Sequence, residues 1–224
     1  MGQNCSVSRI NRYEFWNGTK DIQPGQTVSL NVSAWQPPGL REEVPPACID
    51  ELPQVDPKVG AISRKEDGSI WLTIAKSALS PQTVQIEAKL IHTDARARSD
   101  LSIYRQAEQP LVGFWRQELS SDQDQPPCRQ EQLIGEVHFS ANGEFTVTRK
   151  PFETYKDYWG LYRFDSKTST LALDVIGGNE IPEGIKSGQL ILEKSFFQLG
   201  EASFGEFDGA SECTTTFYRY ERGW

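Results

Sequence analysis

Residues 111–118 read Leu-Val-Gly-Phe-Trp-Arg-Gln-Glu, and we interpret them as the first strand of a β-barrel. Further short runs of strand-like composition follow up to the end of the chain, and turn dipeptides separate several of them. The clearest hairpin signal is Asn142-Gly143. About eight antiparallel strands in so short a segment favour a small closed barrel, because closure leaves no unpaired sheet edge. The expected strands are residues 111–118, 134–139, 144–149, 158–164, 170–175, 190–194, 202–207 and 214–220.

Three residues in the first and last of these strands carry a family resemblance. Gly113 and Trp115 form a G-x-W in the first strand, and Arg219 lies in the last. This pattern resembles the calycin superfamily, the lipocalins and their small bacterial relatives. The resemblance implies that Trp115 plugs the closed end of the barrel, that the Arg219 guanidinium covers its ring, and that Gly113 lets the chain bend.

The segment also departs from the transport lipocalins. It leaves little room for the long helix that usually precedes the final strand, and it has no second family motif near its middle. The resemblance is therefore to the compact bacterial lipocalin-like domains. Because compact barrels are often filled by their own side chains, the resemblance does not by itself imply a carried ligand.

The first half of the chain consists of short alternating runs separated by loops. The runs Thr27–Ser33, Ser69–Ile74 and Thr83–Leu90 alternate apolar with polar residues, and Leu101 and Ile103 complete the set. Proline pairs stop helices between these runs. About seven strands in about 100 residues are typical of a β-sandwich.

A resemblance to bacterial Ig-like domains lies within this half. Residues 60–74 read Gly-Ala-Ile-Ser-Arg-Lys-Glu-Asp-Gly-Ser-Ile-Trp-Leu-Thr-Ile, and the strand Val84–Ala88 follows. Modules of that family usually act as spacers or adhesive surfaces. We therefore expect an all-β protein with an Ig-like β-sandwich over residues 1–106 and a calycin-like barrel over residues 110–224, joined by the short polar linker Gln106–Pro110.

Four cysteines fall two in each half of the chain. None belongs to a C-x-x-C motif or lies near a histidine at ligand spacing, which argues against a zinc site or a redox motif. The division into domains favours the pairs Cys5–Cys48 and Cys128–Cys213 among the three pairings that are open. Reduced, buried thiols are the alternative. In a closed barrel the second disulfide would join the loop after the first strand to the start of the last.

Two disulfides imply an oxidising compartment, so we expect an exported protein, periplasmic or on the cell surface. Residues 1–5, Met-Gly-Gln-Asn-Cys, have neither the charged nor the apolar region of a signal sequence, so we expect that a signal has been removed. Cys5 makes the chain a candidate lipoprotein. However, Asn4 stands where cleavage before a lipid anchor needs a small residue.

Composition restricts the partners. The formal net charge is −8, and no block of Lys and Arg interrupts the acidity, so phosphate backbones repel the protein and nucleic acid is excluded. No apolar run approaches the length of a transmembrane segment. Apolar residues make up 37% of the chain, with six Trp and eleven Phe, which is enough to fill real cores.

The densest aromatic segment, residues 152–164, is the candidate binding site. By strand alternation Tyr158, Tyr162 and Phe164 share one face, while Trp159 and Arg163 share the other. The first three are candidate ligand-binding residues, because pockets combine aromatic walls with a few polar groups. The alternative is that they belong to an ordinary core.

Candidate catalytic groups are few. The two histidines, His92 and His138, fall in different domains, and no Ser/His/Asp constellation or G-x-S-x-G is present. Glu153 and Asp157 lie near the aromatic segment, where an acid pair would resemble a glycosidase centre. Among so many acidic residues some pair always falls near aromatics. We therefore expect no enzyme, no cofactor and no metal.

Two functions follow from this reading. The first is an exported, non-catalytic envelope protein whose Ig-like spacer presents the barrel to a protein or to the envelope. The alternative is that the barrel binds a small apolar or amphipathic ligand, which requires an interior cavity of a few hundred Å³ open at one end. The content of the barrel interior decides between them.

Overall fold

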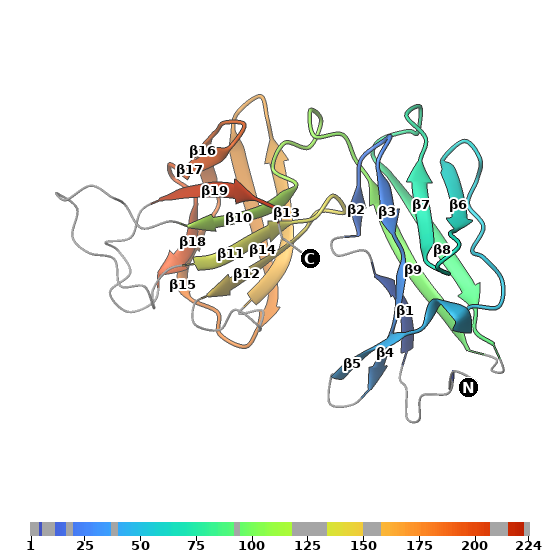
Figure 1. Ribbon diagram of the computed structural model, residues 1–224. Coiled ribbons are helices and arrows are strands. Elements are labelled where there is room, and N and C mark those ends of the chain that lie inside the picture. The colour runs from blue at the N-terminus through green and yellow to red at the C-terminus, as the bar shows by residue number, and fades with distance from the viewer. Residues whose placement is uncertain are drawn as a thin grey trace. The chain divides into compact units, whose positions relative to one another are not determined.

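The computed structural model describes residues 5, 12–16, 20–36, 40–91, 95–117, 134–149, 158–206 and 215–221. These residues form an all-β protein, apart from the short 3-10 helix η1 (Pro46–Cys48). The chain divides into two compact units, residues 1–108 and 109–224, and each is described by itself (Figure 1). Within the described residues, no helix is long and apolar enough to span a membrane.

The first unit contains two β-sheets. A six-stranded sheet has the order β2-β9-β1-β4-β5, with β8 also paired to β9, and a three-stranded sheet has the order β3-β7-β6. The strands are β1 (Arg12–Trp16), β2 (Asp21–Ile22), β3 (Thr27–Ser29), β4 (Asn31–Gln36), β5 (Leu40–Val44), β6 (Gly60–Arg64), β7 (Ile70–Ile74), β8 (Gln82–Lys89) and β9 (Arg96–Ile103).

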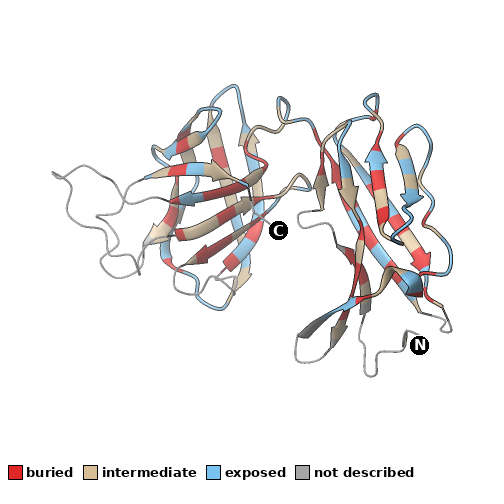
Figure 2. Cartoon of the chain, viewed as in Figure 1, coloured by how far each residue is buried: buried red, intermediate tan, exposed pale blue. Residues whose placement is uncertain are grey.

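The two sheets enclose a single hydrophobic core, as in a β-sandwich. In β8 the alternate residues Val84, Ile86 and Ala88 are buried, while Gln85 and Lys89 are exposed. Figure 2 shows buried residues alternating with more exposed ones in β7 and in the first part of β9 as well. Apolar side chains of both sheets belong to one cluster, so the inner face of each sheet covers the other.

The run Thr27–Ser33 was expected to form one strand, and this expectation is wrong. The run changes sheet at Leu30, because Val28 pairs with Leu72 of β7, whereas Val32 pairs with Phe15 of β1. Leu30 is buried at the crossing, and its amide donates to the carbonyl of Ile70. The alternation continues unbroken because both sheets turn their apolar faces to the same core.

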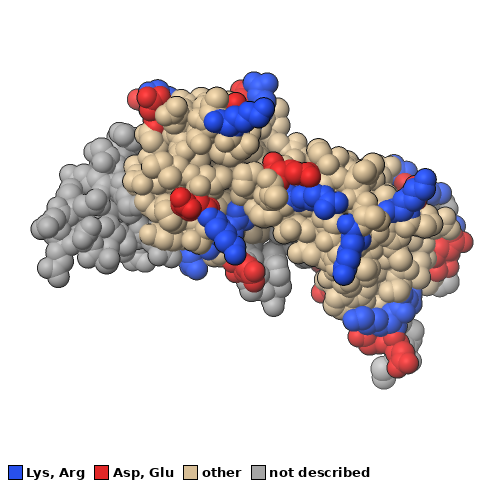
Figure 3. All heavy atoms as spheres, turned by 90° about the horizontal axis from the view of Figure 1, so that it is seen from above, with Lys and Arg blue, Asp and Glu red and all other residues tan. Residues whose placement is uncertain are grey.

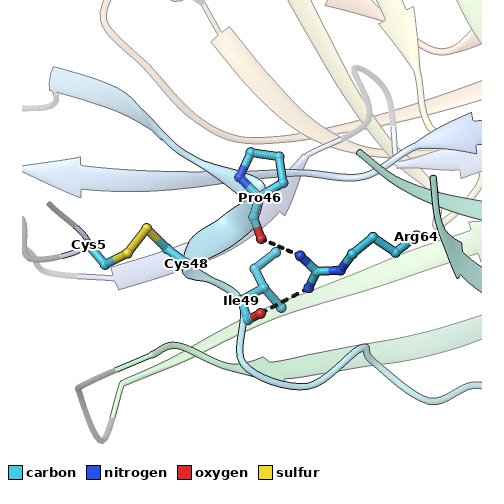
Figure 4. Close-up of a disulfide and its surroundings, with 5 residues drawn as sticks. All are labelled: Cys5, Pro46, Cys48, Ile49 and Arg64. Atoms are coloured by element: carbon cyan, nitrogen blue, oxygen red, sulfur yellow. Dashed lines mark hydrogen bonds between the residues drawn. A yellow bond between two sulfur atoms is a disulfide. The ribbon is translucent and has the colours of Figure 1, made fainter. Parts of the chain in front are cut away.

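A disulfide joins Cys5 to Cys48, with 5.4 Å between their Cα atoms (Figure 4). Cys48 ends η1, and the next residue, Ile49, bridges to Leu90 after β8. From β6 of the other sheet, the Arg64 guanidinium donates to the carbonyls of Pro46 and Ile49 at 3.0 and 2.9 Å. The segment around η1 therefore links both sheets to the N-terminal segment. Cys128 and Cys213 lie outside the described residues.

The second unit is a closed barrel of eight antiparallel strands, which confirms the expected barrel. The strands follow in the order β10-β11-β12-β13-β14-β16-β17-β19, and β19 pairs back onto β10. They are β10 (Gly113–Gln117), β11 (Ile134–Phe139), β12 (Glu144–Arg149), β13 (Tyr158–Asp165), β14 (Thr170–Gly178), β16 (Gly188–Leu192), β17 (Phe196–Leu199) and β19 (Thr216–Tyr220).

One member of the expected barrel is wrong. The seventh strand is β17 and not residues 202–207, of which Ser203–Glu206 form β18. β18 pairs with β15 (Glu183–Lys186) in a separate two-stranded sheet. The reason is the turn at residues 193–195, where the amide of Glu193 donates to the carbonyl of Phe196. Its sequence, Glu-Lys-Ser, lacks the Gly, Asn or Pro that marks most tight turns.

Removing the Cys5–Cys48 disulfide is expected to destabilise the first unit. The bond closes a loop over a sequence separation of 43 residues. A loop of that size corresponds to about 3–4 kcal/mol of lost unfolded-state entropy. Chemical denaturation of the full-length C5S/C48S double variant should therefore show one transition shifted by this amount. An unchanged denaturation curve would contradict the structural role of the bond.

Candidate functional site

Arg219 closes the barrel at the seam between its first and last strands. Its Cζ lies 4.1 Å from the centre of the Trp115 ring, which is fully buried. The guanidinium also donates to two main-chain carbonyls, those of Val112 at 2.7 Å and Pro110 at 2.6 Å. The Trp115 indole in turn donates to the carbonyl of Leu111 at 2.7 Å. These contacts tie the entry segment of the barrel to its last strand.

The position of the Arg219 guanidinium and the local backbone conformation both require a glycine at residue 113. Its φ of +134° lies where side chains are strongly disfavoured, and a Cβ there would stand 2.6 Å from Nη1 of Arg219. The three residues of the calycin-like pattern thus meet at one point. These contacts join the entry segment of the barrel to its last strand.

Aromatic side chains meet across the interior of the barrel. The Phe197 ring of β17 lies 5.0 Å from Trp115 of β10 and 6.2 Å from Phe139 of β11, centre to centre. It also stacks on Phe217 of β19 at 4.8 Å. Since β17 and β11 are not neighbours in the barrel, the contact between Phe197 and Phe139 spans the interior.

A residue from outside the barrel strands completes this filling. Phe204 of β18 is buried, and its ring lies 5.4 Å from Phe217 and 6.3 Å from Phe139. The hydroxyl of buried Tyr158 donates to the Phe204 carbonyl at 2.6 Å, which fixes β18 against β13. The small β15–β18 sheet therefore contributes a plug to the barrel interior.

The candidate ligand-binding residues Tyr158, Tyr162 and Phe164 all pack against the barrel core. The Tyr162 hydroxyl donates to the carbonyl of Ser140 at 3.0 Å, and its ring makes an edge contact with Phe139 at 4.7 Å. Both tyrosine hydroxyls are thus bound to main-chain carbonyls. These are contacts of core side chains, and a ligand-binding role for the three residues stays a prediction.

The opposite face of the same strand is exposed. Trp159 and Leu161 of β13 and Ile176 of β14 are among the exposed large hydrophobic side chains that the structure describes. A Cβ on Gly177, the partner of Trp159 in β14, would stand 3.0 Å from the indole. The indole therefore lies across Gly177 and is held on the outer surface of the sheet.

A depression of about 400 Å³ adjoins these residues. It lies between the turn at Asn142 and Gly143 and the outer face of the β13–β14 hairpin; the residues that line it are Asn142, Gly143, Leu161, Tyr162, Arg163, Ala172, Leu173 and Asp174. The alternation of β13 places Leu161 on the outer face of the sheet and Tyr162 on the inner face. Ile176 lies outside by the alternation of β14, and the register shift between Trp159 and Gly160 leaves it without a direct partner in β13.

His138 also lies on the outer face, where alternation with buried Val137 and Phe139 places it. Its ring stacks on Phe114 at 4.1 Å, and Phe114 is flanked on the other side by Tyr220. This is a packing arrangement, with no nucleophile in the described contacts. His92, Glu153 and Asp157 lie outside the described residues, which contain no cluster of metal-binding side chains.

The carboxylates with shifted pKa lie at turns and on a sheet surface. A hydrogen bond from the Ser69 hydroxyl lowers the pKa of Asp67, and hydrogen bonds from Arg96 and then Arg98 lower that of Glu87. The Lys167 amide lowers the pKa of Asp165, the last residue of β13. Asp165 is exposed at the end of the face that carries Leu161 and Arg163, and its carboxylate is bound by the turn that follows.

On the face that Figure 3 draws, acidic and basic side chains are interspersed among wide areas of neither sign. A scan against protein-family models and a search of curated proteins find no match to the chain.

Substitutions at the seam should destabilise the barrel. G113A introduces backbone strain and a contact with Arg219, and we expect a loss of about 2–3 kcal/mol. R219M removes two hydrogen bonds and the cation–π contact and should cost about 2–4 kcal/mol. A matched control is R116M, because Arg116 stacks on Tyr220 only at the surface. Equilibrium denaturation measures all three, and equal losses for R219M and R116M would contradict the closure.

The Asp67 contact predicts a pH dependence. Because the folded pKa lies below the ordinary value, the contact stabilises the fold above that value and is lost as the pH falls through the folded pKa. The melting temperature of D67N should therefore lie below that of the wild type at neutral pH. The difference should vanish once the pH has fallen below the folded pKa of Asp67. A difference that persists at low pH would contradict this account.

Proposed function

We propose that this protein is an exported, non-catalytic interaction protein, in which an Ig-like spacer carries a lipocalin-like barrel that acts through its outer surface. The observation that carries the proposal is the filled interior. Rings from β10, β11, β17, β18 and β19 contact one another there, which leaves their space to side chains and not to a ligand.

The relationship to lipocalin-like domains is supported by the eight-stranded closed barrel and by the Gly113, Trp115 and Arg219 contacts at its seam. The Ig-like character of the first unit is supported by two facing sheets around one core. Export is supported by the Cys5–Cys48 disulfide, because such bonds persist in oxidising compartments.

Binding of a small apolar ligand inside the barrel is the competing function. It requires room between the strands, and the contacts of Phe197 and Phe204 span that room. The depression of about 400 Å³ opens on the outer face instead and has charged residues on its rim.

Native mass spectrometry tests the proposal on protein purified from an oxidising compartment. We expect the bare chain, lighter than the fully reduced chain by two hydrogens for each disulfide. Both predicted pairs, Cys5–Cys48 and Cys128–Cys213, would together remove four hydrogens. An adduct of a few hundred daltons that is lost on denaturation would overturn the proposal and establish ligand binding.

A variant with a cavity in the barrel interior serves as the comparison for apolar-probe binding. F204A removes the ring that β18 contributes, and removal of a buried Phe costs about 3–5 kcal/mol. We expect this variant, and not the wild type, to enhance the fluorescence of the apolar probe 1-N-phenylnaphthylamine. F204L fills most of the space and serves as the folded control. Strong enhancement by the wild type would contradict a filled barrel.

A further inference from the structure

An apolar cluster lies on the outer face of the β13–β14 hairpin. Trp159, Leu161 and Ile176 have exposed fractions of 41%, 44% and 64%. Trp159 stands opposite Gly177, and Leu161 stands opposite Asp174, so the three side chains lie at adjacent positions of one surface. Apolar side chains that are exposed together, and not singly, mark surfaces that become covered in an assembly.

Two opposite charges lie beside this cluster. Arg163 and Asp174 are both exposed on the same outer face, because Arg163 pairs with Ala172 and Leu161 pairs with Asp174. They are thus diagonal neighbours across the hairpin. In the described part of the chain neither side chain forms an ion pair.

The same face carries both a projection and a hollow. Trp159 is held over Gly177 and projects at one end of the cluster. The depression of about 400 Å³ lies at the other end, between Arg163 and the turn at Asn142 and Gly143. Arg and Trp are the residue types that most often anchor protein interfaces.

We propose that this face associates with the same face of a second copy of the chain. In a two-fold contact each interaction occurs twice, since residue i of one copy meets residue j of the other and the reverse. A surface on which a cation and an anion are diagonal neighbours beside an apolar cluster is complementary to itself when the two-fold axis passes between the two charges. Arg163 of each copy then pairs with Asp174 of the other.

The strand register shows which other residues of the two copies would meet when Arg163 of each copy pairs with Asp174 of the other. Strands lie about 4.8 Å apart and alternate residues about 6.7 Å apart along a strand. On that grid, a two-fold axis that exchanges Arg163 with Asp174 passes close to Leu161, which meets its own counterpart. The same rotation carries Trp159 of one copy towards Asn142 and Gly143 of the other. The projection thus enters the hollow, twice in each dimer.

A second copy suits Arg163 and Asp174 because these two opposite charges exchange positions under one rotation, whereas an unrelated partner would have to supply both complements separately. Two features keep the association weak. The outer face of a barrel is convex, which limits the contact area, and each chain has a formal net charge of −8. We therefore expect a dissociation constant in the micromolar range. The inference goes beyond the proposed function, since it concerns self-association, whether or not the barrel takes a ligand.

Sedimentation velocity over a concentration series, with the full chain, tests the proposal. R163D and D174R each place like charges opposite one another at two points of the contact, and each should weaken association at least about tenfold. The double variant R163D/D174R restores opposite charges and should return the dissociation constant to within about threefold of the wild type. K58D makes the same charge change at an exposed site of the first unit and should have no effect.

Two further variants test the position of the axis. L161D places charges of one sign on the axis and should abolish the dimer, with circular dichroism as the check that the barrel remains folded. Glu144, which pairs with Leu161 from β12, meets its own counterpart near the axis, so E144Q should strengthen the dimer. A chain that stays monomeric up to about 1 mM would overturn the proposal. So would a dimer that the single charge reversals leave unchanged, or one that the double variant fails to restore.

Discussion

The closed barrel depends on the Arg219 guanidinium, which has three tasks at once. It covers the buried Trp115 ring, it binds the carbonyls of Pro110 and Val112, and it occupies the space that a Cβ on Gly113 would need. All three contacts join the start of the first strand to the last strand. Without them the pairing of β10 with β19 would rest on main-chain hydrogen bonds and on the contacts of Tyr220 with Phe114 and Arg116, and opening it would expose two sheet edges.

Aromatic rings also join the strands across the barrel. Trp115 and several Phe rings lie inside it, and Phe204 adds a ring from outside the barrel strands. In β13 the strand alternation that turns Tyr158 and Tyr162 inwards turns Trp159 and Leu161 outwards, so the core face and the exposed face arise from the same sequence pattern.

The barrel was predictable because alternation and turn dipeptides such as Asn142-Gly143 report local structure, and because the calycin-like pattern links the chain ends. Two features were not. The turn after Leu192 contains no Gly, Asn or Pro, so the sequence did not indicate that β17 begins there. The run through Leu30 alternates without a break, so the sequence did not indicate that it changes sheet. The outward direction of Trp159 and Arg163 followed from alternation. Their alignment with Ile176 and Asp174 depends on the bulge before Gly160, a feature of the pairing and not of either strand.

The central claim is that the barrel interior holds side chains and not space. A crystal of the full chain under xenon pressure tests it most directly, because xenon enters apolar cavities that are large enough and dry. The account predicts no xenon among Trp115, Phe139, Phe197 and Phe217. A well-occupied xenon atom between those rings would contradict it and would return the ligand-binding function to first place.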